Sequence, residues 1–260
     1  MKDKVMIVTG AGMGLGLAAA EEFAARGAKL VLVDYNKEAL DKAVAGIKAK
    51  YSGLSAISVV ADISRDGDVK AYVEAAMEAF GRIDGLYNNA GIEGRQAPLV
   101  EYDLDVFKKV VDINLMGVYY GLRYVIPIMK EQGYGRIVNV ASVGGIRGVL
   151  NQTAYVATKH AVTGLTKNAA IEYGQYGVLT NAIAPGAILT PMVEEAFKQV
   201  NPADPKAAEA EYAQRNPTRA LGQPADVAKT VAFLISADNG YVNGQTLAID
   251  GGESNLYGNS

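Results

Sequence analysis

The stretch Val5-Met-Ile-Val-Thr-Gly-Ala-Gly-Met-Gly-Leu-Gly16 decides the fold of this chain. Its apolar start predicts a short buried strand, and an alanine-rich run from Leu17 to Arg26 predicts a helix directly after the glycines. A glycine-rich turn between strand and helix lets backbone N–H groups approach a pyrophosphate, and the helix N-terminus adds the positive end of its dipole. Although ordinary tight turns use the same residues, this order of elements favours dinucleotide binding.

An acidic residue follows the next predicted strand. Lys29-Leu-Val-Leu-Val33 is apolar and ends in Asp34, near the position about 20 residues after the glycines where an acid can bind an adenosine ribose diol. A carboxylate there repels a 2′-phosphate, and no arginine follows in Tyr35-Asn36-Lys37. The sequence therefore predicts NAD rather than NADP, and Lys37 is the one feature that speaks against it.

Strand and helix patterns alternate along the rest of the chain. This alternation predicts an α/β protein with a single Rossmann domain over residues 1–260, a doubly wound seven-stranded parallel sheet with helices on both faces. Proline-rich residues at about 187–215 predict a mobile, partly helical substrate cover. The further strands are expected at 55–60, 83–87, 136–140, 178–183 and 246–249, and the further helices at 37–50, 69–80, 103–129, 154–173 and 224–236.

Composition excludes several classes of protein. The 260 residues are 50% hydrophobic and 20% charged with a net charge of −3, which indicates a sizeable core and no nucleic-acid surface. No cysteine is present, so thiol catalysis and thiolate metal sites are excluded, and only one histidine, His160, could serve a metal or a catalytic triad. No apolar run reaches membrane-spanning length. We expect a cytoplasmic protein without a metal.

Tyr155 and Lys159 form the strongest candidate for chemistry. They lie four residues apart in Asn151-Gln-Thr-Ala-Tyr-Val-Ala-Thr-Lys-His160, so a helix places both on one face. A nearby positive charge favours the phenolate of a tyrosine, whose ordinary pKa is about 10. Taken alone, the pair is weak evidence, because Tyr and Lys at this spacing are common and an interface tyrosine beside a solvated lysine is the more ordinary interpretation. A triad of Ser142 with His160 is disfavoured because the strained Gly-x-Ser-x-Gly turn is missing.

Polar residues gather where the predicted strands end. Asp62 can accept from an adenine amino group or cap the helix that starts near Asp66. The stretch Asn88-Asn-Ala-Gly91 can pass under a ligand or brace a turn. Asn114 lies in an apolar stretch and needs a partner, and Ser142 follows a strand at the edge where open parallel sheets bind ligands.

Together these motifs resemble those of the short-chain dehydrogenase/reductase family, from about Lys4 to Gly252. The resemblance implies a metal-free oxidoreductase that uses NAD. The motifs that carry it are Thr9-Gly10-x-x-x-Gly14-x-Gly16, Asp62, Asn88-Asn-Ala-Gly91, Asn114, Ser142, Tyr155-x-x-x-Lys159 and Pro185-Gly186 with Thr190.

The resemblance also implies catalytic roles. Tyr155 is expected to exchange a proton with the substrate oxygen while a hydride moves at the nicotinamide. Lys159 is expected to hold the nicotinamide ribose and to favour the phenolate, and Ser142 to donate a hydrogen bond to the substrate oxygen. Asn114 would hold a water that joins Lys159 to solvent, and Thr190 would bond the carboxamide of the nicotinamide.

Contacts with the cofactor and the substrate follow from the same resemblance. The residues expected at the cofactor are Gly10, Met13, Gly14, Leu15, Gly16, Asp34, Asp62, Ile63, Asn89, Ala90, Gly91, Tyr155, Lys159, Pro185, Gly186, Ile188 and Thr190. The substrate candidates are placed by position alone: Glu93, Ile146, Gln152 and Met192. Glu93 and Gln152 can hydrogen-bond a second substrate oxygen or brace a loop, and the sequence leaves both open.

The expected activity is the interconversion of a small secondary alcohol and its ketone. Residues 89–94 and 141–148 with Gln152 resemble a family member that acts on a cyclic diketone, which favours cyclic or vicinally oxygenated substrates. A sugar or hydroxysteroid dehydrogenase and a non-catalytic NAD-sensing protein are the alternatives. By resemblance we expect a small-molecule substrate, no nucleic-acid or membrane partner, and a homo-oligomer, with a tetramer favoured over a dimer, formed through helices 103–129 and 154–173.

Overall fold

The computed structural model describes residues 1–256 and contains one parallel sheet. Seven strands lie in the order β3-β2-β1-β4-β5-β6-β7, and every neighbouring pair is parallel. The predicted doubly wound sheet is confirmed. The strands are β1 (Val5–Thr9), β2 (Lys29–Asp34), β3 (Ala56–Val60), β4 (Gly85–Asn88), β5 (Gly135–Val140), β6 (Val178–Pro185) and β7 (Thr246–Ile249).

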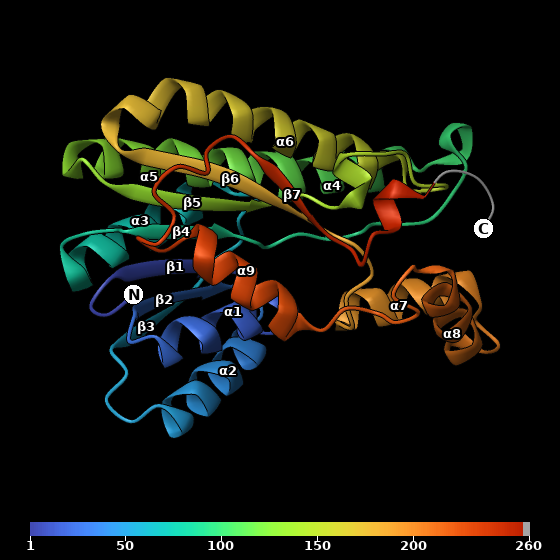
Figure 1. The fold of residues 1–260 in the computed structure, drawn as a ribbon, viewed down its shortest axis with the longest axis horizontal. Coiled ribbons are helices and arrows are strands. Elements are labelled where there is room, and N and C mark those ends of the chain that lie inside the picture. The colour runs from blue at the N-terminus through green and yellow to red at the C-terminus, as the bar shows by residue number, and fades with distance from the viewer. Residues whose placement is uncertain (257–260) are drawn as a thin grey trace.

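Helices cover both faces of the sheet (Figure 1). Alternating side chains of β1 serve the two layers: Ile7 packs in the core with α3, α5 and α6, whereas Met6 packs in the core with α1, α2 and α9. The helices are α1 (Gly14–Ala25), α2 (Lys37–Lys50), α3 (Asp66–Phe80), α4 (Leu104–Val111), α5 (Gly117–Gln132), α6 (Thr153–Tyr173), α7 (Pro191–Val200), α8 (Pro205–Arg215) and α9 (Pro224–Leu234).

Local sequence signals set many helix ends. The side chain of Asn36 accepts a hydrogen bond from the backbone of Ala39 and caps α2, and Asp103 caps α4 in the same way. Gly81 and Gly133 end α3 and α5 in the left-handed conformation that glycine adopts most easily. Because such signals can be recognised in the sequence, most of the predicted strand and helix boundaries agree with the structure within a few residues.

The predicted single helix over 103–129 is wrong in one respect. The segment Asp112–Met116 between α4 and α5 is a π-helix of five residues. A π turn inserts one extra residue into the helical repeat, which an apolar pattern does not reveal. It turns Asn114 into the protein, where this residue is fully buried.

The segment expected to cover the substrate folds as two helices. In Figure 1, α7 and α8 lie beyond the ends of the strands, apart from the two helical layers. Phe197 of α7 packs against Tyr212 of α8 with ring centroids 5.8 Å apart. The two helices therefore support each other at the sheet edge where the candidate residues gather.

Candidate active site

The glycine-rich turn is shaped by close backbone contact. Gly10 has a φ of +65°, and a Cβ on Gly16 would lie 2.0 Å from the carbonyl oxygen of Gly10, so neither position accommodates a side chain. The Asn89 side chain donates to the Thr9 carbonyl at 2.8 Å, and the Thr9 hydroxyl accepts from the backbone N–H groups of Asn89 and Ala90 at 2.9 and 3.0 Å. Residues 88–91 thus brace the turn.

Asp34 is held against this turn. One of its carboxylate oxygens accepts from the backbone N–H of Gly12 at 2.9 Å, and the other accepts from the backbone N–H of Asn36 at 2.9 Å. The side chain is buried at the end of β2. The carboxylate is therefore fixed beside the start of α1, where a dinucleotide would place its adenosine ribose.

Asp62 closes a tight turn before α3. Its carboxylate accepts from the backbone N–H and the hydroxyl of Ser64 at 3.0 and 2.7 Å. The N-cap of α3 is Arg65, so the interpretation of Asp62 as the helix cap is wrong. The chain turns back at Ser64 before the helix begins, and Asp62 stays exposed.

The structure brings Ser142, Tyr155 and Lys159 together. Ser142 follows β5, is buried, and lies close enough to Tyr155 to lower the pKa of its phenol, while Ser142 Oγ accepts from the backbone N–H of Gly144 at 3.1 Å. Lys159 lies one turn further along α6, with its Nζ 5.3 Å from the centre of the Tyr155 ring. The same Nζ donates to the Val140 carbonyl at 2.8 Å.

Burial dominates the electrostatics of this cluster. It raises the pKa of Tyr155 to about 12, against the effect of the hydrogen bond with Ser142, and the negative charge of Glu93 acts in the same direction as burial. Burial lowers the pKa of Lys159 to about 8. The protein's own groups therefore favour the neutral phenol, opposite to the expected effect of Lys159.

Asn114 links the π turn to the loop after β4. Its amide nitrogen donates to the carbonyl of Ile92 at 2.7 Å, and its Oδ1 accepts from the backbone N–H of Ile92 at 2.8 Å. A Cβ on Gly91 would lie 3.0 Å from this Oδ1 and 3.6 Å from Nζ of Lys159. Asn114, Gly91 and Lys159 are therefore close neighbours.

The residues that follow β6 form a wall of the candidate site next to the glycine-rich turn. The backbone N–H of Gly186 donates to the Ile249 carbonyl at 3.0 Å, and Ile188 is buried. The Thr190 hydroxyl donates to the Ile188 carbonyl at 3.2 Å and caps α7 by accepting from Val193 at 3.4 Å. A Cβ on Gly14 would lie 3.4 Å from the Thr190 side chain, so this wall reaches the glycine-rich turn.

Glu93 and Gln152 contact each other. The Gln152 amide donates to Oε1 of Glu93 at 2.6 Å, and the Gln96 amide donates to the same oxygen at 3.1 Å. Glu93 is half-buried, and burial raises its pKa, while the bond from Gln96 lowers it. The bracing role is thus observed, and it leaves Glu93 near Tyr155, whose pKa it raises. Gln96 carried no spacing signal in the sequence.

Other candidates occupy different surroundings. Ile146 and Met192 are 41% and 39% exposed, so both offer apolar surface near the end of the sheet. His160 is exposed on α6, with its Nδ1 2.9 Å from the Val156 carbonyl oxygen. His160 is therefore next to Lys159 in the sequence, but its imidazole lies on the exposed surface of the helix and not among the candidate site residues.

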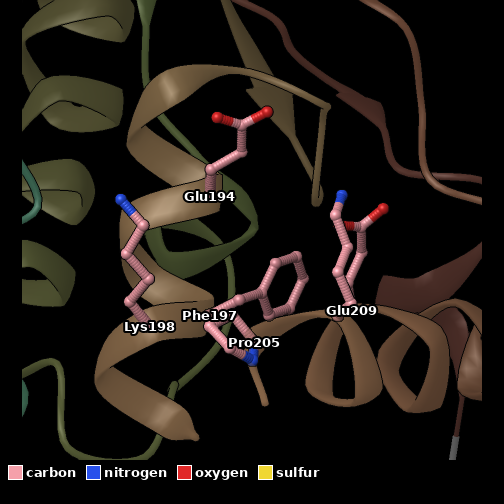
Figure 2. Close-up of a pocket in the computed structure, with 6 residues that line it drawn as sticks. Glu194, Phe197, Lys198, Pro205 and Glu209 are labelled. Atoms are coloured by element: carbon pink, nitrogen blue, oxygen red, sulfur yellow. The ribbon is translucent and has the colours of Figure 1, made fainter. Parts of the chain in front are cut away.

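A small pocket of about 190 Å³ separates α7 from α8. Figure 2 shows the Phe197 ring between the two helices, with charged side chains around it. None of the predicted site residues lines this pocket. Its walls are Glu194, Phe197, Lys198, Pro205, Lys206 and Glu209.

Metal binding and membrane insertion find no support among residues 1–256. In that part of the chain no group of three or more His, Asp or Glu side chains could hold a metal ion. No helix described there is both long and apolar enough to cross a membrane.

Comparison with known proteins connects the whole chain to oxidoreductases. A family model described as enoyl-(acyl carrier protein) reductase matches residues 10–254. Levodione reductase of Leifsonia aquatica is 51% identical over 255 residues, which are 98% of this chain and 96% of that protein. Cyclohexanol dehydrogenase of an Acinetobacter species is 40% identical over 249 residues, with 96% and 94% covered.

Solved structures agree with these relatives. The crystal structure of levodione reductase superposes with a TM-score of 0.98 and covers 99% of this chain and 100% of that one. The structure of NAD⁺-bound xylitol dehydrogenase, at 37% identity, superposes with a TM-score of 0.91 and covers 95% of this chain and 98% of that one. The resemblance predicted from the loop residues is thus confirmed.

Proposed function

The chain belongs to the short-chain dehydrogenase/reductase family, and from that membership we propose that it interconverts a small secondary alcohol and its ketone with NAD. It is an oxidoreductase of CH–OH and carbonyl groups by family. The observation that supports the proposal most directly is the contact of Ser142 with Tyr155 beside the buried Lys159.

The residues around the glycine-rich turn fit a dinucleotide. The turn has no room for a Cβ at Gly10 or Gly16, so its backbone stays open to a pyrophosphate at the start of α1. Asp34 presents a fixed carboxylate at the end of β2, which suits a ribose diol and repels a 2′-phosphate. The turn fits either dinucleotide, and Asp34 supports NAD as the nucleotide.

Tyr155 is the proposed acid and base. A bound nicotinamide supplies or accepts the hydride. With its pKa raised to about 12, Tyr155 carries its proton at neutral pH and can donate it to a carbonyl oxygen. Ser142, which lies beside Tyr155, is placed to donate to the same oxygen and to stabilise its developing charge.

Lys159 is proposed to serve the cofactor and the proton path. Its Nζ points to the Val140 carbonyl and keeps two further donor hydrogens for ribose hydroxyls or water. Its pKa of about 8 allows it to give and take protons near neutral pH. Gly91 leaves space between Lys159 and Asn114, as a water relay between them requires.

The proposed substrate is cyclic or carries a second oxygen near the reacting carbon. Levodione reductase and cyclohexanol dehydrogenase are named for ring compounds, and this chain is similar to both over nearly its full length. Glu93 lies near Tyr155 and can accept a hydrogen bond from a second hydroxyl. Ile146 and Met192 supply apolar surface for a ring.

A polyol is the second candidate substrate. The likeness to xylitol dehydrogenase favours it, because neighbouring hydroxyls would suit a half-buried carboxylate such as Glu93. A protein that only senses NAD would have no use for Ser142 beside Tyr155 and the buried Lys159. We also propose a homotetramer built on α4, α5 and α6, where Tyr119 and Ile171 are 39% and 81% exposed.

Initial rates with NAD and NADP test the proposal across cyclic alcohols, vicinal diols, linear polyols and steroid alcohols. We expect turnover with NAD on ring alcohols or diols, and a rate with NADP lower by about 100-fold, because Asp34 repels the extra phosphate. Preference for NADP would refute the assignment of Asp34. Binding of NAD without turnover on any compound would support the sensor instead.

A further inference from the structure

A buried carboxylate joins three segments around the candidate site. Oε1 of Glu253 accepts hydrogen bonds from the Arg147 guanidinium and from the Tyr212 hydroxyl, the latter at 2.6 Å. Glu253 follows β7 and is only 8% exposed. We name Arg147, Tyr212 and Glu253 the polar clasp.

Each member of the polar clasp belongs to a different part of the site. Arg147 lies in the loop that begins at Ser142, and its backbone N–H donates to the Val143 carbonyl at 3.0 Å. Tyr212 lies on α8 and packs on Phe197 of α7. The polar clasp therefore connects the Ser142 loop with the helices that cover the end of the sheet.

The Glu253 carboxylate also touches the wall after β6. Its second oxygen, Oε2, is buried and has no hydrogen-bond partner within residues 1–256, and a Cβ on Gly186 would lie 3.0 Å from it. Any larger residue at 186 would press against this oxygen. Glu253 therefore lies where the cover, the Ser142 loop and the Gly186 wall meet.

The hydrogen bonds that Tyr212 and Arg147 donate to Glu253 differ in the free energy that their loss would cost. A buried carboxylate that loses Tyr212 still faces the Arg147 guanidinium, so its charge stays paired. If Glu253 loses its charge, the guanidinium of Arg147 loses its partner, and Arg147 Nε is already without one in the described part of the chain. The contact with Tyr212 can therefore break at a lower cost than the ion pair with Arg147.

We propose that Glu253 is a positioning residue that holds α7 and α8 in one arrangement with the Ser142 loop. Loss of the hydrogen bond from Tyr212 allows α7 and α8 to move and leaves the Ser142 loop in place. Loss of the Glu253 charge allows both α7 with α8 and the Ser142 loop to move. The effect on catalysis rests on the proposed function, whereas the mechanical link between the two segments does not.

Hydrogen exchange of the purified full-length protein tests the link directly. Tyr212→Phe should speed amide exchange in residues 191–215 by about tenfold, as expected for one lost hydrogen bond to a charged group, and leave residues 141–150 unchanged. Glu253→Gln should speed exchange in both segments. Glu211→Gln is the matched control, because Glu211 precedes Tyr212 on α8 and pairs with the exposed Arg215.

Kinetics on an active substrate separate positioning from general stability. Tyr212→Phe should raise KM about tenfold with kcat changed less than about twofold, because only the cover is loosened. Glu253→Gln should lower kcat as well, because the Ser142 loop moves too. Tm should differ little between Tyr212→Phe and Glu211→Gln.

The outcomes distinguish the two proposals. Unchanged exchange in residues 191–215 of both Tyr212→Phe and Glu253→Gln would overturn the polar clasp, whatever the activity. Altered exchange in a protein that turns over no alcohol or ketone would support the link and refute the proposed function. Altered exchange with unaltered KM and kcat would overturn the positioning role and leave the proposed function intact.

Discussion

Burial moves the pKa values of Tyr155 and Lys159 in opposite directions, because it disfavours the charged form of each group. The phenol is held neutral with a pKa of about 12, and the ammonium is brought to a pKa of about 8. At neutral pH the Tyr155 phenol is thus protonated, and the Lys159 ammonium beside it is close to its pKa. A phenolate requires further positive charge, which an oxidised nicotinamide carries.

Replacing Tyr155 by Phe should lower kcat/KM by about 10² to 10⁴-fold, the usual contribution of a positioned acid or base. The hydroxyl is lost but the ring remains, so the dissociation constant for NAD should stay within about threefold. Steady-state rates and a fluorescence titration measure both. Tyr124→Phe, at a half-buried tyrosine of α5 that donates to Asp66, is the control and should change neither value. Lost binding in Tyr155→Phe would indicate a structural tyrosine.

Lys159 should make stability depend on pH. Its pKa is lowered from 10.5 to about 8, so between these values the unfolded chain holds a proton that the folded protein has released. The free energy of unfolding should therefore rise with pH above about 8, by on the order of 3 kcal/mol over the full interval, while the penalty is fully present below pH 8.

Lys159→Met removes this titration, and urea unfolding between about pH 7 and pH 10 measures it. The variant should be more stable than the parent at pH 7 and should lack the rise. Parallel pH profiles for parent and variant would show that Lys159 keeps its ordinary pKa in the folded protein.

Single residues show how far the sequence predicts the site. The spacing of Tyr155 and Lys159 was sufficient to place them on one helix face, and the end of β5 placed Ser142 beside them. The direction of the Tyr155 pKa could not be predicted, because it depends on burial by segments far away in the sequence. The sequence left open whether Glu93 and Gln152 bind a substrate oxygen or brace a loop, and the hydrogen bond between them became visible only in the fold.

At the scale of the element, the π turn between α4 and α5 is the part that the sequence did not predict. Strands and helices along the chain can be predicted from hydrophobic periodicity and capping residues, and the bounds of α2 and β7 were predicted residue for residue. A π turn adds one residue to the helical repeat over a single turn, which is too short a change to show in the apolar pattern of the segment. The buried Asn114 was its one visible trace.

Asn114→Ala should destabilise the protein by about 2 to 4 kcal/mol, because the N–H and C=O of Ile92 both lose a buried partner. The loop after β4 should loosen first. Thermal unfolding measures the stability, and hydrogen exchange at the Ile92 amide measures the loop.

Asn114→Asp is the comparison for the amide itself, since it keeps an acceptor for the Ile92 N–H, loses the donor to the Ile92 carbonyl and adds a carboxylate at a buried position. The Ile92 amide should exchange more slowly in Asn114→Asp than in Asn114→Ala, whatever burial of the carboxylate costs in stability. If the Ile92 amide exchanges equally slowly in all three proteins, the π turn does not anchor this loop.

At the scale of the whole molecule, chemistry and anchoring lie at opposite ends of the strands. The candidate site follows the carboxyl ends, whereas Asp84 precedes β4 at the other end. Asp84 is fully buried and accepts from Lys4 at 3.1 Å, from Arg82 and from the Val5 N–H at 3.0 Å. Burial alone would raise its pKa, but these three partners together lower it.

Asp84→Asn should therefore reduce stability at neutral pH by about 2 to 3 kcal/mol, because two cations lose their partner. A lowered carboxyl pKa stabilises the fold above its ordinary value of 3.8 and loses that effect as the pH falls through the folded value. The difference between parent and variant should thus shrink in acid.

Chemical unfolding at neutral pH and at about pH 3 checks this expectation, with kcat measured where both proteins are folded. The value of kcat should be the same in both, because Asp84 lies at the opposite end of the strands from the candidate site. A constant difference in stability at both pH values would show that the effect of Asp84 is not ionic.

The overall architecture was predictable because it follows from local order. Alternating strands and helices leave few arrangements for a parallel sheet with right-handed crossovers, and the glycine-rich turn selects one of them. The polar clasp was not predictable, since Arg147 and Glu253 are 106 positions apart and no sequence pattern links them. Contacts of that kind appear only when the fold is complete.

The close approach at Gly16 has a genetic consequence. Every one-base change in a glycine codon that alters the amino acid adds a Cβ, and at this position that atom would lie 2.0 Å from the backbone of Gly10. No single missense mutation there can be neutral. At Gly46 and Gly67, inside α2 and α3, a Cβ would meet nothing within 4 Å, and alanine would even stabilise the helix. Glycine thus occupies both a position where no side chain fits and positions where one fits freely.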